Sequence, residues 1–257
     1  NRLKIDFNYF ITRLEEHQVD FVRSAHLDCF VRVKHMAGIG ESDMFRQGFF
    51  VVQDESAGLA VRLLDPKPGE RVLDLCAAPG GKTTYIGELM KNLGEIVAVD
   101  RYESRLNLVR TACQRLGIAN VHFLTADASA LKIPPGDRVL ADVPCSGLGV
   151  LSKKPDAKWK REAMDLITLS AIAEAILENA ATLVRPGGVL VYCTCTTEPE
   201  ENMEVVLKFL ARHPEFQIER ADRYVDPALV NADGCIETYP HRHGMDGSFA
   251  IRLTRIG

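Results

Sequence analysis

Short apolar runs alternate with longer amphipathic stretches along the chain from about residue 70 onward. The apolar runs are rich in β-branched residues and each is followed by a turn signal, which is typical of buried strands. They cover residues 71–76, 95–100, 121–126, 138–142 and 189–195. The stretches between them have apolar positions at helical spacing and predict helices over residues 82–93, 103–116, 161–184 and 200–213.

This alternation predicts an α/β fold in which a mostly parallel sheet has helices on both faces. Two further segments, at residues 217–219 and 248–254, add strands near the C-terminus, and the second alternates apolar with polar or small residues. We therefore expect a seven-stranded sheet within residues 46–257.

The first 45 residues follow a different pattern. A short helix is expected at residues 9–16 and one strand at residues 27–33, before a loop that contains glycine. One helix and one strand bury little apolar surface alone, so we interpret residues 1–45 as a partial α+β appendage.

The composition fits a folded globular protein, since 46% of the residues are apolar and 26% are charged. No apolar run approaches the roughly 20 residues that span a bilayer, and the opening residues lack a signal-peptide core, so we expect a cytoplasmic protein. The seven cysteines include no Cys-x-x-Cys pair, and we interpret them as reduced thiols. A formal charge of -4 gives no overall basic footprint, so nucleic-acid binding would need a local basic cluster.

A run of small residues joins the predicted strand at residues 71–76 to the helix that follows it. Residues 73–83 read Leu-Asp-Leu-Cys-Ala-Ala-Pro-Gly-Gly-Lys-Thr. Small side chains let the backbone approach a ligand closely at the carboxyl end of a parallel strand. A nucleoside-triphosphate loop would require glycine where Cys76 stands, and a tight turn without a ligand remains the other alternative.

Asp100 and Asp127 end the next two predicted strands. A carboxylate in this position can accept hydrogen bonds from ribose hydroxyls, although a single strand-end Asp also serves as a helix cap. Their shared placement favours a nucleoside ligand. The lack of a phosphate-binding loop favours S-adenosylmethionine over a dinucleotide.

Two cysteine-bearing segments follow the fourth and fifth predicted strands, Asp-Val-Pro-Cys at residues 142–145 and Cys-Thr-Cys-Thr at residues 193–196. Both thiols then lie beside the same crevice, where a thiolate can act as a nucleophile, although packing is the common role of a buried cysteine. A zinc site is disfavoured because no His lies at ligand spacing. We also expect Cys193 and Cys195 to point to opposite faces of the sheet.

Three of these segments together resemble the Sun/Fmu family of RNA 5-methylcytosine methyltransferases. They are residues 74–83, 142–150 and 192–196, the last followed by Pro-Glu-Glu-Asn at residues 199–202. Residues 47–56 and 245–249 match the family as well. The resemblance extends from about residue 45 to the C-terminus and is greatest to the bacterial branch of 16S ribosomal RNA small-subunit methyltransferase B.

The resemblance implies a Rossmann-like S-adenosylmethionine-dependent methyltransferase domain at residues 46–257 and an RNA-binding appendage at residues 1–45. It implies that Cys195 is the nucleophile and that Cys145 assists product release. It also implies a cofactor site formed by Cys76, Ala77, Ala78, Pro79, Gly80, Gly81, Lys82, Asp100, Arg105, Asp127 and Asp142.

The chemistry gives these roles a reason. Cytosine C5 is a poor nucleophile until a thiolate adds at C6, and release of the product then requires a second acid–base group. Lys82 could lower the pKa of the attacking thiol, and Asp142 could hold the N3 edge of cytosine. We therefore place Lys82 and Asp142 among the catalytic residues.

Basic residues gather around Trp159, just after the segment that carries Cys145. The cluster comprises Lys153, Lys154, Lys158, Lys160 and Arg161. We expect it to contact RNA phosphates, with a solvated loop as the alternative. Trp159 could equally pack on Pro155 or stack on a base.

The sequence therefore predicts a monomeric RNA (cytosine-C5)-methyltransferase that acts on ribosomal RNA and uses neither a metal nor a membrane. Three alternatives remain: a transfer-RNA enzyme of the same chemistry, a DNA-type enzyme in which Cys145 attacks, and a catalytically silent cofactor-binding factor in RNA assembly. The cysteine at position 195 argues against the second alternative. The third is disfavoured because a scaffold has no use for the full set of catalytic residues.

Overall fold

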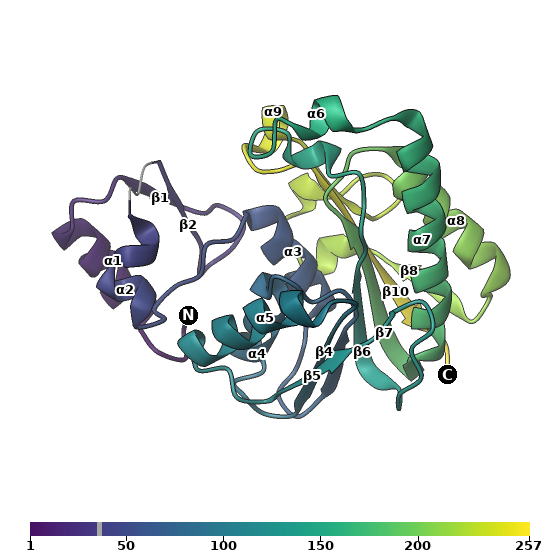
Figure 1. Cartoon of the computed structure of the whole chain (residues 1–257), viewed down its shortest axis with the longest axis horizontal. Coiled ribbons are helices and arrows are strands. Elements are labelled where there is room, and N and C mark those ends of the chain that lie inside the picture. Colours follow the sequence, from purple (N-terminus) through teal and green to yellow (C-terminus); the bar gives the residue numbers. More distant parts are fainter. Residues whose placement is uncertain (35–37) are drawn as a thin grey trace.

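A central sheet of eight strands organises the computed structural model, which describes residues 1–34 and 38–257 (Figure 1). The strand order is β5-β4-β3-β6-β7-β10-β8, and the short β9 pairs with β10 beside this path. The strands are β3 (Arg71–Asp74), β4 (Glu95–Asp100), β5 (Val121–Thr125), β6 (Gly136–Asp142), β7 (Val184–Thr194), β8 (Phe216–Glu219), β9 (Ile236–Thr238) and β10 (Ser248–Arg255).

The strands from β5 to β7 are parallel, and β10 runs antiparallel to its neighbours. The predicted mostly parallel α/β sheet is confirmed, and the main path contains the seven expected strands. β9 is an addition, because three residues are too few to show an alternating pattern.

Helices cover both faces of the sheet, with α3, α4 and α5 on one face and α7 and α8 on the other (Figure 1). The helices of this part are α3 (Glu55–Leu64), α4 (Gly81–Leu89), α5 (Glu103–Leu116), α6 (Ala157–Lys160), α7 (Ala163–Thr182), α8 (Met203–Arg212) and α9 (Pro240–His243). Short 3-10 turns lie in the connections: η1 (Ile39–Glu41), η2 (Leu148–Val150), η3 (Pro199–Glu201), η4 (Ala221–Arg223) and η5 (Pro227–Leu229). Of the helices that the structure describes, not one is both long and apolar enough to traverse a membrane.

Strand β4 shows why helices must cover both faces of the sheet, since its apolar side chains lie on both. Ile96 packs in the core beneath α3 and α4 with Ile86, whereas Val97 and Val99 face the opposite core with Leu177 of α7. Burying each such side chain stabilises the fold by about 1.5–3 kcal/mol. A strand buried on both faces therefore reads as a continuous apolar run.

Several predicted boundaries are wrong. The helix expected to reach residue 93 ends at Leu89, because Lys91 and Asn92 take positive φ angles that end a right-handed helix. The helix expected at 161–184 is shorter at both ends, since α7 covers Ala163–Thr182, and the short α6 before it was not expected. Helix α3 and the early start of β7 at Val184 were not expected.

The N-terminal segment consists of α1 (Phe7–Glu16), β1 (Phe21–Arg23), β2 (Val31–Val33) and α2 (Asp43–Arg46). The prediction of a single strand at residues 27–33 is wrong, since two short strands, β1 and β2, form an antiparallel pair instead. Residues 35–37 of the expected loop lie outside the described residues. The segment packs around Phe10 and Leu14 and includes Phe49 and Phe50, beyond the expected boundary at residue 45.

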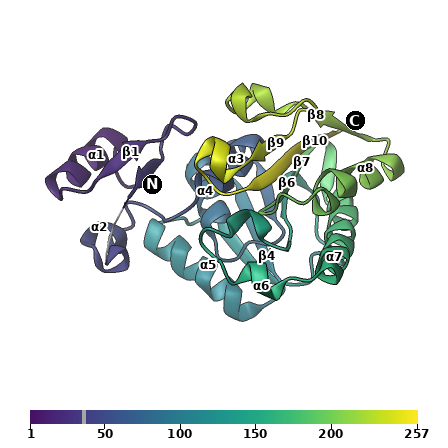
Figure 2. The same ribbon diagram turned by 90° about the horizontal axis from the view of Figure 1, so that it is seen from above.

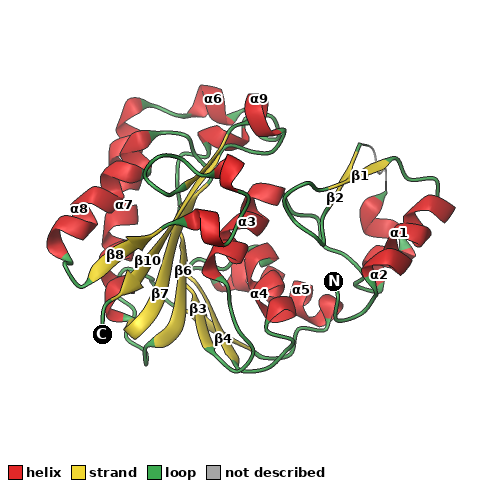
Figure 3. Cartoon of the chain, turned by 180° about the vertical axis from the view of Figure 1, so that it is seen from behind, coloured by secondary structure: helices red, strands yellow, loops and turns green. Residues whose placement is uncertain are grey.

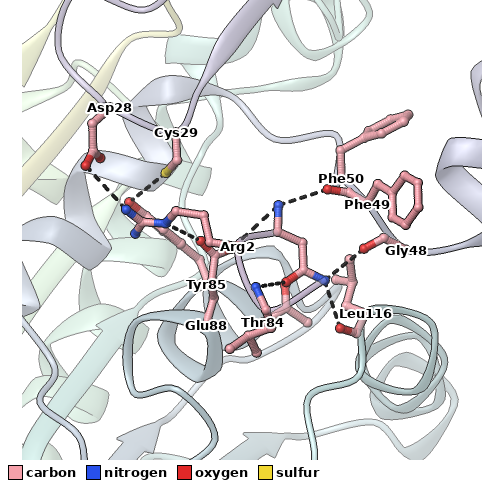
Figure 4. A network of polar contacts seen from close by, with 12 residues as sticks. Arg2, Asp28, Cys29, Gly48, Phe49, Phe50, Thr84, Tyr85, Glu88 and Leu116 are labelled. Carbon is pink, nitrogen blue, oxygen red and sulfur yellow. Dashed lines mark hydrogen bonds and ion pairs between the residues drawn. The ribbon is translucent and has the colours of Figure 1, made fainter. Parts of the chain in front are cut away.

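Polar contacts join the N-terminal segment to α4 and α5, although it lies to one side of the sheet (Figures 2 and 4). The Asn1 side-chain amide donates to the carbonyl oxygens of Gly48 and Leu116, both at 2.8 Å. Arg2 donates to Glu88 of α4 at 2.9 Å. The segment is therefore anchored on two helices that flank the parallel strands.

The strand order reverses between β3 and β6, which are parallel neighbours although β4 and β5 lie between them in sequence. In open α/β sheets, ligands bind outside the carboxyl ends of the strands at such a switch point. Helices α6 and α9 rise above the sheet at one end (Figures 1 and 3).

Two buried arginines hold the C-terminal end of α3. Arg138 of β6 donates to the carbonyl oxygen of Leu64 at 2.7 Å and forms two bonds to Glu70, at 2.5 and 3.0 Å. Arg252 of β10 donates to the same carbonyl at 3.1 Å. Cations at a helix C-terminus satisfy carbonyl groups that have no partner within the helix.

We expect Arg138→Ala to lower the free energy of unfolding by about 3 kcal/mol, because Glu70 would lose its partner in a largely buried site. Urea denaturation measures the loss. Arg46→Ala is the control, since the Arg46–Asp43 pair is mostly exposed and should contribute about 0–1 kcal/mol. Equal losses in the two variants would contradict this role for Arg138.

Candidate active site

A cavity of about 1100 Å³ lies at the carboxyl ends of β3, β6 and β7 and extends to the N-terminal segment. Ten residues predicted for the site line it: Cys76, Ala77, Ala78, Pro79, Gly81, Lys82, Asp142, Lys153, Lys154 and Cys195. The other predicted residues, Gly80, Asp100, Arg105, Asp127, Cys145, Lys158, Lys160 and Arg161, do not contribute to its lining.

The turn after β3 is shaped by small residues packed close to α5. Gly80 has a φ of 108°, which favours glycine, and a Cβ there would lie 3.1 Å from the Cα of Val109. The backbone N–H of Ala77 donates to the carbonyl oxygen of Val99 at 2.8 Å, which joins the turn to β4. Burial raises the pKa of the Cys76 thiol, so this cysteine keeps its proton.

Asp100 and Arg105 brace this turn from β4 and α5. Asp100 Oδ2 accepts from the backbone N–H of Ala78 at 3.4 Å and lies 3.6 Å from Arg105 Nη1. Arg105 Nη2 donates to the carbonyl oxygen of Ala78 at 3.1 Å. Asp127 is instead exposed and accepts hydrogen bonds from Ser129, as in a local turn.

Lys82 and Asp142 form an ion pair at the cavity, with Lys82 Nζ donating to Asp142 Oδ2 at 2.7 Å. Lys82 lies in the first turn of α4, and Asp142 ends β6. Burial favours the neutral amine, but the negative charge of Asp142 outweighs it and raises the pKa of Lys82. Lys82 is therefore positively charged in this site.

Cys193 contacts the other oxygen of Asp142, and its Sγ donates to Oδ1 at 3.3 Å. Burial raises the pKa of Cys193 well above its ordinary value, so the thiol remains a donor. Our expectation that Cys193 and Cys195 point to opposite faces is wrong, because residues two positions apart in a strand share a face. Cys195 lies just beyond the end of β7 and is exposed.

The thiols of Cys145 and Cys195 lie 3.2 Å apart, and the backbone N–H of Cys195 points to Cys145 Sγ at 3.3 Å. The hydrogen bond from Cys145 lowers the pKa of Cys195, although the protein atoms that surround the partly exposed sulfur oppose the shift by displacing water from it. The same contact and burial raise the pKa of Cys145 well above its ordinary value. The pair therefore favours a thiolate at Cys195 with a thiol donor beside it.

Within residues 1–34 and 38–257, no group of three His, Cys, Asp or Glu side chains is arranged to hold a metal ion.

The basic cluster divides into two parts, of which the first faces the cavity. Lys153 binds two carboxylates, Asp54 at 2.5 Å and Asp246 at 2.8 Å. Lys154 lines the cavity with an exposed side chain. Lys153 is therefore engaged in joining three segments, whereas Lys154 remains accessible to a ligand.

The second part of the cluster lies on or just after α6. Lys158 lies beside the ring of Trp159, with Nζ 5.2 Å from its centroid, and Lys160 is exposed on the same helix. Arg161 Nε instead donates to the carbonyl oxygen of Ser146 at 2.9 Å, which gives it a structural role. The Trp159 side chain is 82% exposed and is not buried against the loop.

Two residues at the cavity were missed as candidates. They are Gln53 and Asp74. Three of their side-chain atoms, Gln53 Nε2, Gln53 Oε1 and Asp74 Oδ1, are buried and have no hydrogen-bond partner among the described residues. Burial raises the pKa of Asp74 to about 7, against the opposing hydrogen bond from Thr83. Gln53 lies within a segment that matched the family, but nothing in its spacing indicated a role.

The model of a family described as "16S rRNA methyltransferase RsmB/F" matches residues 61–254. The chain belongs to this family. An RsmB/F relative from Bacillus subtilis (strain 168), "Probable ribosomal RNA small subunit methyltransferase B", is 40% identical over 233 residues, which are 88% of this chain and 52% of the relative. The chain thus spans about half the length of the curated relatives it matches.

Two solved structures share the fold of this chain. A methyltransferase homolog protein from Pyrococcus horikoshii superposes with a TM-score of 0.86 at 30% identity, covering 99% of this chain and 84% of that chain. NSun6 from Pyrococcus horikoshii with SFG has a TM-score of 0.87 at 24% identity, covering 99% and 89%, and shows the same fold. The fold is that of S-adenosylmethionine-dependent methyltransferases, as the resemblance implies.

We expect Cys195 to be alkylated by iodoacetamide with a pH midpoint below that of an ordinary cysteine, about 8.5, because the Cys145 thiol stabilises its thiolate. Cys145→Ala removes this donor and should raise the midpoint. Mass spectrometry of the modified peptide measures the rate at each pH. Cys113, whose pKa is raised to about 12 by burial, should remain unmodified as an internal control. An unchanged midpoint in Cys145→Ala would contradict the assigned hydrogen bond.

Proposed function

We propose that this chain transfers a methyl group from S-adenosylmethionine to C5 of a cytosine in small-subunit ribosomal RNA, with Cys195 as the nucleophile. The observation that carries the proposal is the thiol pair, 3.2 Å apart, in which the pKa of Cys195 is lowered and that of Cys145 is raised. The names of the family and of the Bacillus subtilis relative support ribosomal RNA as the substrate.

The cavity offers a fit for the cofactor. The turn from Cys76 to Lys82 presents a close backbone approach, and the unpartnered atoms of Gln53 and Asp74 can pair with a ligand that has both donors and acceptors. The NSun6 structure was solved with SFG, an analogue of S-adenosylmethionine, which supports the same cofactor class here. When bound, the cofactor supplies an electrophilic methyl group on a sulfonium.

Attack begins at Cys195, whose thiolate forms a bond to C6 of cytosine. The electron pair of the C5–C6 double bond then makes C5 nucleophilic. C5 would take the methyl group as the bond between that methyl and the sulfonium sulfur breaks, which leaves a neutral thioether. Asp142 and Lys82 hold the N3 edge of the base as electron density shifts there, and their 2.7 Å contact supports a joint role. Their pairing keeps one negative and one positive group at the same position of the cavity.

Release of the product breaks the bond between Cys195 and C6 of cytosine. The proton on C5 passes to solvent water, which reaches the exposed Cys195, the electron pair restores the C5–C6 double bond, and Cys195 departs as a thiolate. Cys145 lies within 3.2 Å of the departing sulfur and can donate its S–H hydrogen bond to it. This contact supports a role for Cys145 in release rather than in attack.

The two cysteine variants should have opposite phenotypes on a 16S ribosomal RNA fragment. Cys195→Ala should form no covalent adduct and lose methyl transfer by on the order of 10⁴-fold or more. Cys145→Ala should still attack and methylate but accumulate an RNA adduct that survives denaturing electrophoresis. Cys113→Ala, a buried cysteine outside the cavity, is the matched control.

An adduct that forms in Cys195→Ala and is absent from Cys145→Ala would reverse the assignment and favour the DNA-type mechanism. Methylation of transfer RNA in preference to the ribosomal fragment would identify the other substrate class. Cofactor binding without methylation of either RNA would indicate a silent assembly factor.

The accessible lysines give a second prediction, since Lys154 lines the cavity and Lys158 is exposed on α6. Lys154→Glu and Lys158→Glu should each weaken RNA binding and reduce the slope of log K against log salt by about 0.7–0.9 per lost phosphate contact. Lys91→Glu, at an exposed lysine that does not line the cavity, should leave the slope unchanged. Filter binding over a salt series measures the slope, and a value that matches wild type in all three variants would place the RNA path elsewhere.

A further inference from the structure

A buried polar network connects the two loops that carry Cys145 and Cys195. Ser146 directly follows the first cysteine and Thr196 the second, and Glu201 lies in η3. The exposed fraction of each of Ser146, Thr196 and Glu201 is at most 1%. Groups buried to this extent must find their hydrogen-bond partners within the protein.

Ser146 is held by both its backbone and its side chain. Its backbone N–H donates to Glu201 Oε1 at 2.7 Å, and its hydroxyl lies 2.5 Å from Glu201 Oε2. The same hydroxyl lies 2.9 Å from Thr196 Oγ1. The Glu201 carboxylate therefore makes two hydrogen bonds to Ser146, which follows Cys145. The Ser146 hydroxyl in turn links it to Thr196, which follows Cys195.

Glu201 is itself fixed to the end of β7. The Tyr192 hydroxyl donates to the carbonyl oxygen of Glu201 at 2.5 Å. The Asn202 side chain donates to the carbonyl oxygen of Thr196 at 3.1 Å and accepts from Thr194 Oγ1 at 2.6 Å. The carboxylate is thus anchored to the strand that leads into Cys195.

We propose that Glu201 is a positioning residue that sets the separation of the Cys145 and Cys195 thiols. The catalytic consequence of this role rests on the proposed function, whereas its geometry does not. Among the described residues no ion pair includes Glu201, so its carboxylate oxygens depend on Ser146 for hydrogen-bond donors. If the carboxylate is lost, Arg161 and Thr196 still hold Ser146, but the loop of Cys145 loses two contacts and can shift away from Cys195. Such a shift weakens the S–H···S hydrogen bond between the thiols.

The test compares Glu201→Ala, which removes the carboxylate, with Glu201→Gln, whose amide oxygen can still accept from the Ser146 backbone. Glu200→Gln is the matched control, because Glu200 lies in the same 3-10 turn with an exposed side chain. Tyr192→Phe is a milder variant that removes only the bond anchoring Glu201 to β7, and it serves if Glu201→Ala does not fold.

Glu201→Ala should move the pH midpoint of Cys195 alkylation toward that of an ordinary cysteine, and Glu201→Gln should recover part of the shift. Single-turnover methyl transfer should fall by about 100-fold in Glu201→Ala, as expected for a misplacement of about 1 Å, with RNA KM and cofactor affinity unchanged. Tyr192→Phe should change both quantities in the same direction by less. A purely structural role would lower Tm without moving the alkylation midpoint.

The alkylation profile needs neither RNA nor cofactor, so it tests the positioning even if the proposed function fails. A wild-type protein without methyl transfer would refute the proposed function alone. Folded Glu201→Ala or Tyr192→Phe protein with the wild-type alkylation midpoint would overturn the role of Glu201, and so would an equal shift in Glu200→Gln.

Discussion

Asp142 and Cys193 face each other across the parallel pairing of β6 and β7, and this register determines where the reactive groups lie. The chain leaves both strands at the same edge of the sheet, so two short loops can bring Cys145 and Cys195 within contact distance. Because β3 borders β6 on its other side, the turn after β3 brings α4 and its Lys82 to Asp142. Three neighbouring strands thus supply the cavity with charge, thiols and a close backbone approach.

The groups around Cys195 act on it in opposite directions. The charge of Asp142 raises the pKa of the thiol, and the charges of Lys82 and Lys154 lower it. As Lys82 and Asp142 are paired at 2.7 Å, their effects on a neighbouring sulfur largely offset each other. The hydrogen bond from Cys145 is the largest influence and gives the shift its direction. Placement of one thiol therefore controls the protonation of the other.

The local pattern of apolar residues was sufficient to predict the parallel strands and the order of the motifs that follow them, because each buried strand is a short apolar run in the sequence. It was not sufficient for β1 and β2, whose three residues each make an antiparallel pair too short to show alternation. The hydrogen bonds of Arg161 and Glu201 could not be predicted from the sequence for a different reason. Each depends on Ser146, which is 15 residues from one and 55 from the other, and no periodicity records such a distance.

Near Cys195, backbone hydrogen bonds join three segments of the chain, two of them at glycines. Gly149 donates to the carbonyl oxygen of Cys195 at 3.1 Å and accepts from Gly247 at 2.8 Å, and a Cβ on Gly149 would lie 2.0 Å from the Gly247 oxygen. The contact between Gly149 and Gly247 joins positions almost 100 residues apart, so its formation is opposed by loop-closure entropy. On a ribosome, which releases the chain from its N-terminus, the parallel strands can assemble first. The loop of Cys145 acquires the support of Gly247 only when that residue has emerged, so the reactive edge is completed after the parallel strands.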